Sequence, residues 1–223
     1  MIQRLRNGRC FNISDKAHKD WWEKTYPNWE HGTSKFMDTH CRPDKVTLDI
    51  GAWNGVHTLY MAMMSKKVYA LEPDPRAFDI LLDNVLCNPA LRPLISTLPI
   101  ALSNICGRVR IMNGGGSGSS IIKDVQAKHP SISTVEVRCI TFRQLLADLG
   151  VRPDEIGFIK MDIEGAESMC IPDMEWFLKD YRGAICLSLH EGFMPDEAMD
   201  NIVQIMSRYF IQVSGSEWIW RAG

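Results

Sequence analysis

Apolar and polar positions indicate alternating strands and helices from about residue 45 onward. Short apolar or β-branched runs bounded by glycine, proline or acidic residues are typical of buried strands, and apolar residues spaced three and four apart indicate helices. Strands are therefore predicted at 46–50, 68–71, within 94–102, and at 109–112, 135–140, 156–161, 184–189, 210–213 and 217–220. Helices are predicted over 56–65, 75–86, 141–149 and 195–209.

The alternation predicts the fold class. Strands that alternate with helices imply right-handed crossovers and a mostly parallel sheet covered on both faces. We therefore predict an α/β protein with a doubly wound, mostly parallel seven-stranded sheet in a domain over residues 44–223. Residues 1–43 have no clear period and are predicted to form a short helical extension that caps this domain. Ligands of such sheets bind beyond the carboxyl ends of the strands.

Composition narrows the classes of function. The formal net charge of -2 gives no bulk attraction to nucleic acid or to anionic membranes, so neither is expected as a partner. The seven cysteines are widely spaced without a C-x-x-C pair, which favours reduced thiols in a cytoplasmic protein. No apolar run is long enough for a membrane span, and the amino-terminal segment does not have the pattern of a signal peptide. Oligomeric state stays open.

The loop after the first core strand, Asp49-Ile50-Gly51-Ala52-Trp53-Asn54-Gly55, has the general form of a nucleotide-binding turn. Gly51 allows a sharp exit from the strand and Gly55 a close start of the next helix, although tight packing alone also explains such glycines. A pyrophosphate requires bare backbone at the middle position, where Trp53 would crowd it. The loop therefore favours S-adenosylmethionine, which has no phosphate and whose sulfonium and ammonium groups suit Asp49 and Asp162.

Glu72 adds a second feature. It ends the second predicted strand, about twenty residues beyond the loop, where an acidic side chain can accept both ribose hydroxyls of a nucleoside. The alternative is a solvated carboxylate at a strand end. The agreement of loop and spacing favours the ribose contact.

The series of motifs in this chain resembles the FkbM-type methyltransferases, a family within the Rossmann-like class I S-adenosylmethionine-dependent fold. The motifs are Leu48 to Ala52, Val68 to Pro75, Asn84, Ala101 to Ser103, and Ile159 to Glu167. The resemblance implies transfer of a methyl group from S-adenosyl-L-methionine, leaving S-adenosyl-L-homocysteine. It implies a hydroxyl oxygen of a small molecule, sugar or glycan as the usual acceptor.

The resemblance and the strand-end positions together give a set of candidate cofactor-binding residues. The candidates are Glu30, Asp49, Gly51, Ala52, Trp53, Asn54, Gly55, Thr58, Glu72, Pro73, Ala101, Leu102 and Asp162. Glu30, like Thr33, is suggested by the resemblance alone, as a contact to the methionine end. Many family members have asparagine where this chain has Trp53, with Asn54 one place later, so the side chain that contacts the methionine end stays open.

Three residues are candidates for the chemistry: Asp162, Glu164 and His190. His190 ends the fifth core strand, and a neutral imidazole is a good general base for a hydroxyl. Asp162 and Glu164 are then expected to organise the site. The alternatives are a histidine packed under a loop, and carboxylates that fix the turn through backbone N–H groups. With Glu191 these residues could instead hold magnesium or manganese, but their spacing matches no metal motif and no metal is expected.

Other interpretations stay open at this point. A non-catalytic S-adenosylmethionine-binding domain would keep the cofactor loop, whereas an NAD-dependent oxidoreductase fits poorly with Trp53. Acceptor contacts are expected from the amino-terminal segment and from about 105–140. The aromatic residues Trp21, Trp22, Tyr26 and Trp29 would wall an acceptor pocket or form a partner surface. The glycine-rich run 114–120 is either a lid or a surface loop.

Overall fold

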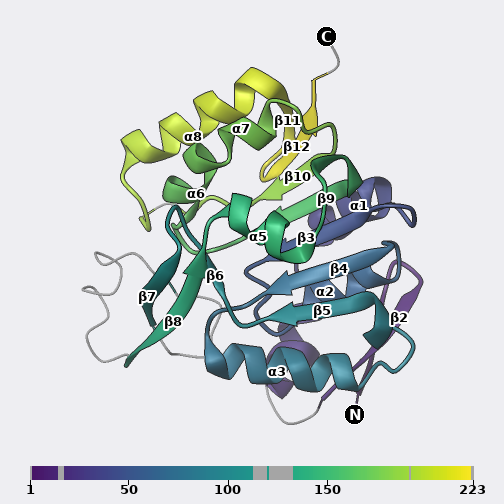
Figure 1. Ribbon diagram of the computed structural model, residues 1–223. Coiled ribbons are helices and arrows are strands. Elements are labelled where there is room, and N and C mark those ends of the chain that lie inside the picture. Colours follow the sequence, from purple (N-terminus) through teal and green to yellow (C-terminus); the bar gives the residue numbers. More distant parts are fainter. Residues whose placement is uncertain (1, 15–17, 113–119, 121–132, 191, 222–223) are drawn as a thin grey trace.

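The computed structural model describes residues 2–14, 18–112, 120, 133–190 and 192–221, and a seven-stranded sheet forms their centre (Figure 1). Its strand order is β11-β12-β10-β9-β3-β4-β5. The bounds are β3 (Val46–Ile50), β4 (Lys67–Leu71), β5 (Ile95–Leu98), β9 (Ile156–Met161), β10 (Ala184–Leu187), β11 (Phe210–Ser214) and β12 (Glu217–Trp220). The pairs from β5 to β10 are parallel, and β12 is antiparallel to both of its neighbours. The predicted α/β class with a seven-stranded sheet is confirmed.

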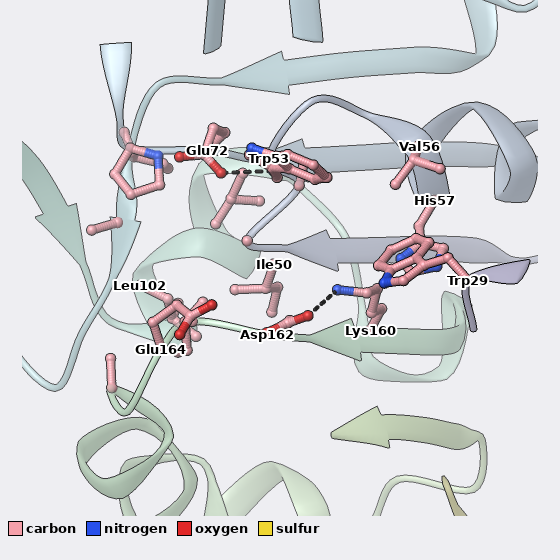
Figure 2. A pocket seen from close by; sticks show the side chains of 18 of the residues that line it. Trp29, Ile50, Trp53, Val56, His57, Glu72, Leu102, Lys160, Asp162 and Glu164 are labelled. Atoms are coloured by element: carbon pink, nitrogen blue, oxygen red, sulfur yellow. Dashed lines mark hydrogen bonds and ion pairs between the residues drawn. The ribbon is translucent and has the colours of Figure 1, made fainter. Parts of the chain in front are cut away.

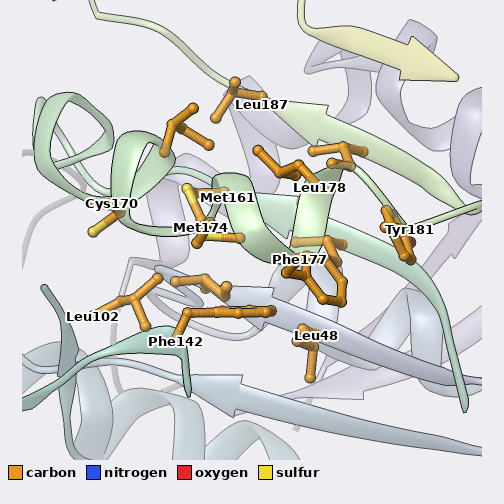
Figure 3. Packing of buried hydrophobic residues seen from close by; sticks show 14 of the residues in the cluster. Leu48, Leu102, Phe142, Met161, Cys170, Met174, Phe177, Leu178, Tyr181 and Leu187 are labelled. Atoms are coloured by element: carbon orange, nitrogen blue, oxygen red, sulfur yellow. The ribbon is translucent and has the colours of Figure 1, made fainter. Parts of the chain in front are cut away.

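Helices cover both faces of this sheet. One face packs against α5 (Phe142–Leu149), α6 (Glu167–Asp173), α7 (Glu175–Leu178) and α8 (Asp196–Tyr209). Figure 3 shows Leu48 of β3 in this cluster with Phe142 and Phe177, whose ring centroids lie 4.8 Å apart. The other face packs against α1 (His31–His40), α2 (Val56–Ala62) and α3 (Pro75–Leu86). The sheet is apolar on both sides, which accounts for the near-continuous apolar runs of its central strands.

The alternation of side chains along the strands decides which residues meet which helices. In β9, Ile159 and Met161 belong to the cluster with α5 to α8, whereas Phe158 belongs to the cluster with α1 to α3. Since successive side chains of a strand point to opposite faces, Lys160 lies on the same face as Phe158. A charged residue is therefore placed in the interior, under α1 and α2.

The amino-terminal extension is only partly helical, so this prediction was wrong for its first residues. β1 (Ile2–Arg6) and β2 (Arg9–Ile13) form an antiparallel hairpin closed by Asn7-Gly8, both with positive φ. Asn-Gly suits the two-residue turn that matches strand twist, and this local signal outweighs the weak periodicity around it. Helical structure follows in η1 (Trp21–Thr25), η2 (Tyr26–Asn28) and α1. The extension shares a hydrophobic cluster with α2 and α3.

The strand predicted within 94–102 is divided. β5 ends at Leu98, and β6 (Ala101–Leu102) instead joins β7 (Gly107–Met112) and β8 (Thr134–Ile140) in a three-stranded sheet. Pro99 separates the two pieces, and because proline has no N–H it cannot continue a strand ladder. The 3-10 turns η3 (Arg92–Leu94) and η4 (Pro153–Glu155) precede β5 and β9.

Two further helices, α6 and α7, were not predicted. They are short, and Pro172 lies inside α6, so they give little periodic signal. Elsewhere the predicted elements form with small differences, such as a helix that ends at Ala62 instead of residue 65. Within the described part of the chain, no helix combines the length and apolarity that a bilayer span requires.

Candidate active site

A pocket of about 900 Å³, part of it at the open mouth, lies where β3, β4 and β9 end (Figure 2). Its lining comes from the amino-terminal extension, the β3–α2 loop and the ends of β4, β6 and β9. The residues are Trp21, Trp29, Ile50, Gly51, Ala52, Trp53, Val56, His57, Leu71, Glu72, Pro73, Ile100, Ala101, Leu102, Lys160, Asp162, Ile163, Glu164 and Ala166. The pocket therefore occupies the carboxyl edge of the sheet, where ligands of such folds bind.

Nine predicted site residues line this pocket: Gly51, Ala52, Trp53, Glu72, Pro73, Ala101, Leu102, Asp162 and Glu164. The other six lie beside or beneath it: Glu30, Asp49, Asn54, Gly55, Thr58 and His190. Of the aromatic residues in the extension, Trp21 and Trp29 belong to the wall, whereas Trp22 and Tyr26 are buried in the core. The run 113–119 and Glu191 are outside the described residues.

Glu72 is a buried carboxylate rather than a solvated one, with 6% of the residue exposed. Its Oε2 accepts a hydrogen bond from the Trp53 backbone N at 2.7 Å, and its Oε1 accepts one from the Asp74 N at 2.8 Å. Burial raises the pKa of Glu72 to about 7, although both backbone N–H groups act in the opposite direction. The end of β4 is thus bound to the β3–α2 loop.

Gly51 is required by close packing. Its φ is +85°, and a Cβ on it would lie 1.8 Å from the carbonyl oxygen of Asp162. The loop therefore passes against the end of β9 at a distance that only glycine allows. Tight packing by itself explains this glycine, and the same packing sets the loop against Asp162 at the pocket wall.

The β3–α2 loop is held in its conformation by buried contacts of Asn54, Gly55 and Asn84. Asn54 is fully buried; its Oδ1 accepts from the Val56 N at 3.1 Å and its carbonyl from Asn84 Nδ2 at 2.8 Å. A Cβ on Gly55 would lie 2.5 Å from Leu81 Cδ1. These residues shape the loop and do not line the pocket. For Gly55, the reason for a glycine is therefore tight packing against Leu81.

Asp49 and Lys160 are register partners on the neighbouring parallel strands β3 and β9. Asp49 is fully buried, and the Thr58 hydroxyl of α2 donates a hydrogen bond to it. Burial raises the pKa of Asp49 to about 6. The Lys160 Nζ lies 3.0 Å from Asp162 Oδ2 (Figure 2). Burial disfavours the ammonium, but Asp162, Asp49 and Glu30 outweigh that effect and raise the pKa of Lys160, so it stays a cation.

His57 forms the neighbouring part of the wall. It is 5% exposed, and its ring stacks on Trp29 with 4.9 Å between centroids. Its Nε2 lies 3.4 Å from Glu30 Oε2, and burial lowers the pKa of His57 well below its ordinary value, so the ring is neutral. The backbone of Trp29 is held by the Arg6 guanidinium, which donates to its carbonyl oxygen. The hairpin of the extension thereby positions this wall.

The three predicted catalytic residues, Asp162, Glu164 and His190, lie close together. Asp162 contacts Lys160 through Oδ2 and His190 through Oδ1. The His190 Nε2 lies 3.3 Å from Asp162 Oδ1 and 3.7 Å from Glu164 Oε1. Its Nδ1 lies 3.8 Å from Glu167 Oε1. The structure thus brings together side chains from two neighbouring strand ends, as their positions in sequence had indicated.

These contacts set the charge of each group. Glu167 contributes most to raising the pKa of His190, which reaches about 9 with Asp162 and Glu164 against the opposing effect of burial. Burial raises the pKa of Glu164 to about 7. Burial acts in the same direction on Asp162, but Lys160 and His190 outweigh it and lower its pKa. In the ligand-free protein, His190 is therefore protonated at neutral pH.

The turn that carries Glu164 is fixed by its backbone. Glu164 has a φ of 55° and Gly165 one of 95°. The fully buried Glu167 carboxylate accepts hydrogen bonds from the N atoms of Ile163 and Gly165, both at 2.8 Å. Ser120 Oγ donates to the Glu164 carbonyl at 2.6 Å. The carboxylate that fixes this turn is therefore that of Glu167. The side chains of Asp162 and Glu164 line the pocket instead.

A divalent cation is chemically compatible with the same cluster. One ligand atom each from Asp162, Glu164 and His190 lies within 4.8 Å of the other two. Carboxylate oxygens with one imidazole suit magnesium or manganese, but a cation would compete with the proton and ion pairs of His190. The arrangement permits a metal without requiring one.

Lys160 and His57 are pocket residues that the sequence prediction did not assign. Lys160 stands within the apolar strand Ile156–Met161, and a lysine there is a signal in itself because lysine is almost never fully buried without a partner. His57 gave no such signal, since its burial depends on Trp29 of the extension.

Comparisons with known proteins bear on the fold and on the family of the chain. No curated protein matches the chain in sequence. The solved structure of methyltransferase FkbM from Methylobacillus flagellatus KT matches with 13% identity and a TM-score of 0.53 over 86% of this chain and 51% of that one. The chain thus spans about half the length of that protein. At such identity the likeness shows the fold alone.

Two other solved structures are similar at lower scores. Precorrin-6y C5,15-methyltransferase from Geobacter metallireducens GS-15 has 14% identity and a TM-score of 0.49 over 92% of this chain and 80% of its own. An rRNA methylase from Streptococcus thermophilus has 14% identity and a TM-score of 0.48 over 84% and 91%. The family model of the methyltransferase FkbM domain matches residues 49–211, well over half of the chain. The chain therefore belongs to the FkbM methyltransferase domain family.

Proposed function

We propose that the protein is an S-adenosylmethionine-dependent methyltransferase that methylates a hydroxyl oxygen of a small molecule, sugar or glycan. The observation that carries this proposal is one pocket that joins the buried Glu72 to the wall formed by Asp162 and Glu164, with His190 behind them. Membership of the FkbM family supports methyl transfer. The hydroxyl acceptor rests on the family resemblance, and the net charge of -2 gives no reason to expect a nucleic acid.

The polar and charged groups of the pocket fit S-adenosylmethionine. The two oxygens of Glu72 are placed at a strand end where they can accept the ribose hydroxyls. The β3–α2 loop presents Trp53 rather than a bare glycine nest, so it suits a nucleoside without phosphates. Asp162 supplies negative charge for a cationic ligand. When bound, the cofactor supplies an electrophilic methyl group on its sulfonium.

In the proposed mechanism, His190 Nε2 accepts the proton of the acceptor hydroxyl, and Glu167 orients the imidazole from the Nδ1 side. Asp162 and Glu164 lie beside Nε2, where they organise the site and stabilise the imidazolium that forms. Glu72 and Asp162 would hold the cofactor, which would supply its methyl group to the oxygen that His190 deprotonates. His190 must be neutral for this role, although it is protonated in the ligand-free site. Positive charge bound beside Asp162 weakens the hold of the carboxylates on that proton and favours the neutral base.

A calorimetric titration with S-adenosylmethionine, S-adenosylhomocysteine and NAD tests the proposal. We expect micromolar binding of the first two, weakened by Glu72→Ala and unaffected by Asp79→Ala, which removes an exposed carboxylate of α3. Turnover of a panel of hydroxylated acceptors then tests the reaction. Binding of NAD alone, or of none of the three, would contradict the proposed function.

A further inference from the structure

One end of the pocket is built from charged and polar side chains that are almost completely buried. The side chains of Lys160 and His57 are 4% and 6% exposed, and both line the pocket. Glu30 and Asp162 lie beside them. We propose that Lys160 and His57 bind the carboxylate of the cofactor's amino-acid group, and that Glu30 and Asp162 bind its ammonium. This inference rests on the proposed function.

Both donors have unused hydrogen-bonding capacity. An ammonium group has three N–H donors, and in the described part of the chain Lys160 Nζ has one acceptor, Asp162 Oδ2. The His57 Nε2 is buried and forms no hydrogen bond among the described residues, although Glu30 Oε2 lies 3.4 Å away. Buried polar atoms are normally paired, so the unpaired His57 Nε2, beside the remaining N–H donors of Lys160 on the same pocket wall, indicates a missing acceptor.

The charges call for a ligand of both signs. Lys160 faces three carboxylates, those of Asp162, Asp49 and Glu30, while the imidazole of His57 is neutral. An anion alone would be held by Lys160 but repelled by the surplus of carboxylates. A cation alone would leave the donors of Lys160 and His57 unused. A zwitterionic α-amino acid satisfies both sets of groups.

The position of this end also suits the cofactor. Lys160 and Asp162 belong to β9 and its carboxyl end, and Glu72 follows β4, with β3 between them. Neighbouring strands lie about 4.8 Å apart, so the two groups are separated by roughly 10 Å across the sheet edge. Figure 2 shows Trp29, His57 and Lys160 at one side of the pocket and Glu72 at the other. A ligand with ribose on Glu72 would thus extend its amino-acid group toward Lys160.

Two ligands that differ in this group test the inference by affinity alone. S-adenosylhomocysteine has the amino-acid group, whereas 5′-methylthioadenosine ends in a methyl group at the same sulfur. We expect Lys160→Met to weaken binding of S-adenosylhomocysteine by about 10- to 100-fold, the range of a hydrogen bond to a charged group. Binding of 5′-methylthioadenosine should be nearly unchanged. Lys67→Met is the matched control and should change neither affinity, because Lys67 is the first residue of β4 and the pocket lies at the carboxyl ends of the strands.

A second variant keeps the test decisive if Lys160→Met destabilises the fold, which a thermal melt of each variant would reveal. His57→Phe keeps a ring of similar size against Trp29 and removes the donor, so it should weaken S-adenosylhomocysteine selectively, by a smaller factor. The inference is overturned if the variants affect both ligands equally or neither. If the unmodified protein binds neither ligand, the proposed function fails as well.

Discussion

The carboxylate of Glu72 accepts a hydrogen bond from the backbone N of Trp53 at 2.7 Å, and this contact joins the end of β4 to the β3–α2 loop. The side chain proposed to bind ribose therefore also holds the loop that faces the ligand. Burial of this carboxylate gives it a pKa of about 7, so its charge changes within the physiological range.

Affinity for S-adenosylhomocysteine should rise with pH across about 7. The ionised Glu72 accepts ribose hydroxyls, and the protonated form loses part of that capacity. Titration calorimetry at about one unit below and one unit above this pKa measures the step. Glu72→Gln should remove it, whereas Glu164→Gln should retain it, although Glu164 has a similar pKa. A step that disappears with Glu164 instead would assign it to the other carboxylate.

His190→Ala should lower turnover by at least about 10²-fold, the scale of general-base catalysis, and leave affinity for S-adenosylhomocysteine nearly unchanged. The reason is that His190 lies next to Asp162 and Glu164 but does not line the main pocket. Turnover and binding are measured on the same preparations. His40→Ala, at the carboxyl end of α1, is the control. Retained turnover in His190→Ala would reject its role as the base.

The ion pairs of His190 should make stability depend on pH. Its folded pKa of about 9 is raised above the ordinary value of 6.5, so the stabilisation is fully present below about pH 6.5 and is lost as pH rises through about 9. Relative to His190→Gln, this contribution should be about 1–3 kcal/mol. Urea unfolding of both proteins across this range measures it. Equal pH profiles would show that the pairs contribute nothing.

Turnover should survive treatment with EDTA. His190 is proposed to act as a base while paired with Asp162 and Glu164, and a bound cation would displace its proton and block Nε2. Activity of chelated enzyme, compared with enzyme supplied with magnesium, decides the matter. Loss of activity that magnesium restores would assign the cluster of Asp162, Glu164 and His190 to a metal.

Gly51→Ala should destabilise the protein by about 3 kcal/mol or more, because the new Cβ meets the Asp162 carbonyl oxygen at 1.8 Å and φ is positive. Gly32→Ala is the matched control. Its nearest atom would lie at 3.7 Å, inside α1, where alanine favours the helix by about 0.5–1 kcal/mol. Denaturant unfolding of the two variants gives the comparison. Equal stabilities would show that the loop moves away from β9 at little cost.

Local patterns were sufficient for much of the fold. The helix 75–86 forms as predicted, with Pro75 in its first turn and Asp74 accepting from the Arg76 N. Asn7-Gly8 was an equally local signal for a hairpin, which the prediction of a helical extension overlooked. Where a signal extends over few residues, as in the short helices α6 and α7, periodicity gives no guidance.

By itself, the sequence determined most of the strands and helices from residue 45 onward, the edge of the sheet at which the pocket lies, and the acidic residues at the strand ends. These follow from periodicity and from residue types that act within one element. Only the tertiary structure decided that Asp49 lies beneath the pocket beside Lys160, and that Trp29 covers His57. Burial and charge pairing are properties of segments far apart in the chain. The protonation of Glu72, Lys160 and His190 therefore follows from packing, which no local pattern contains.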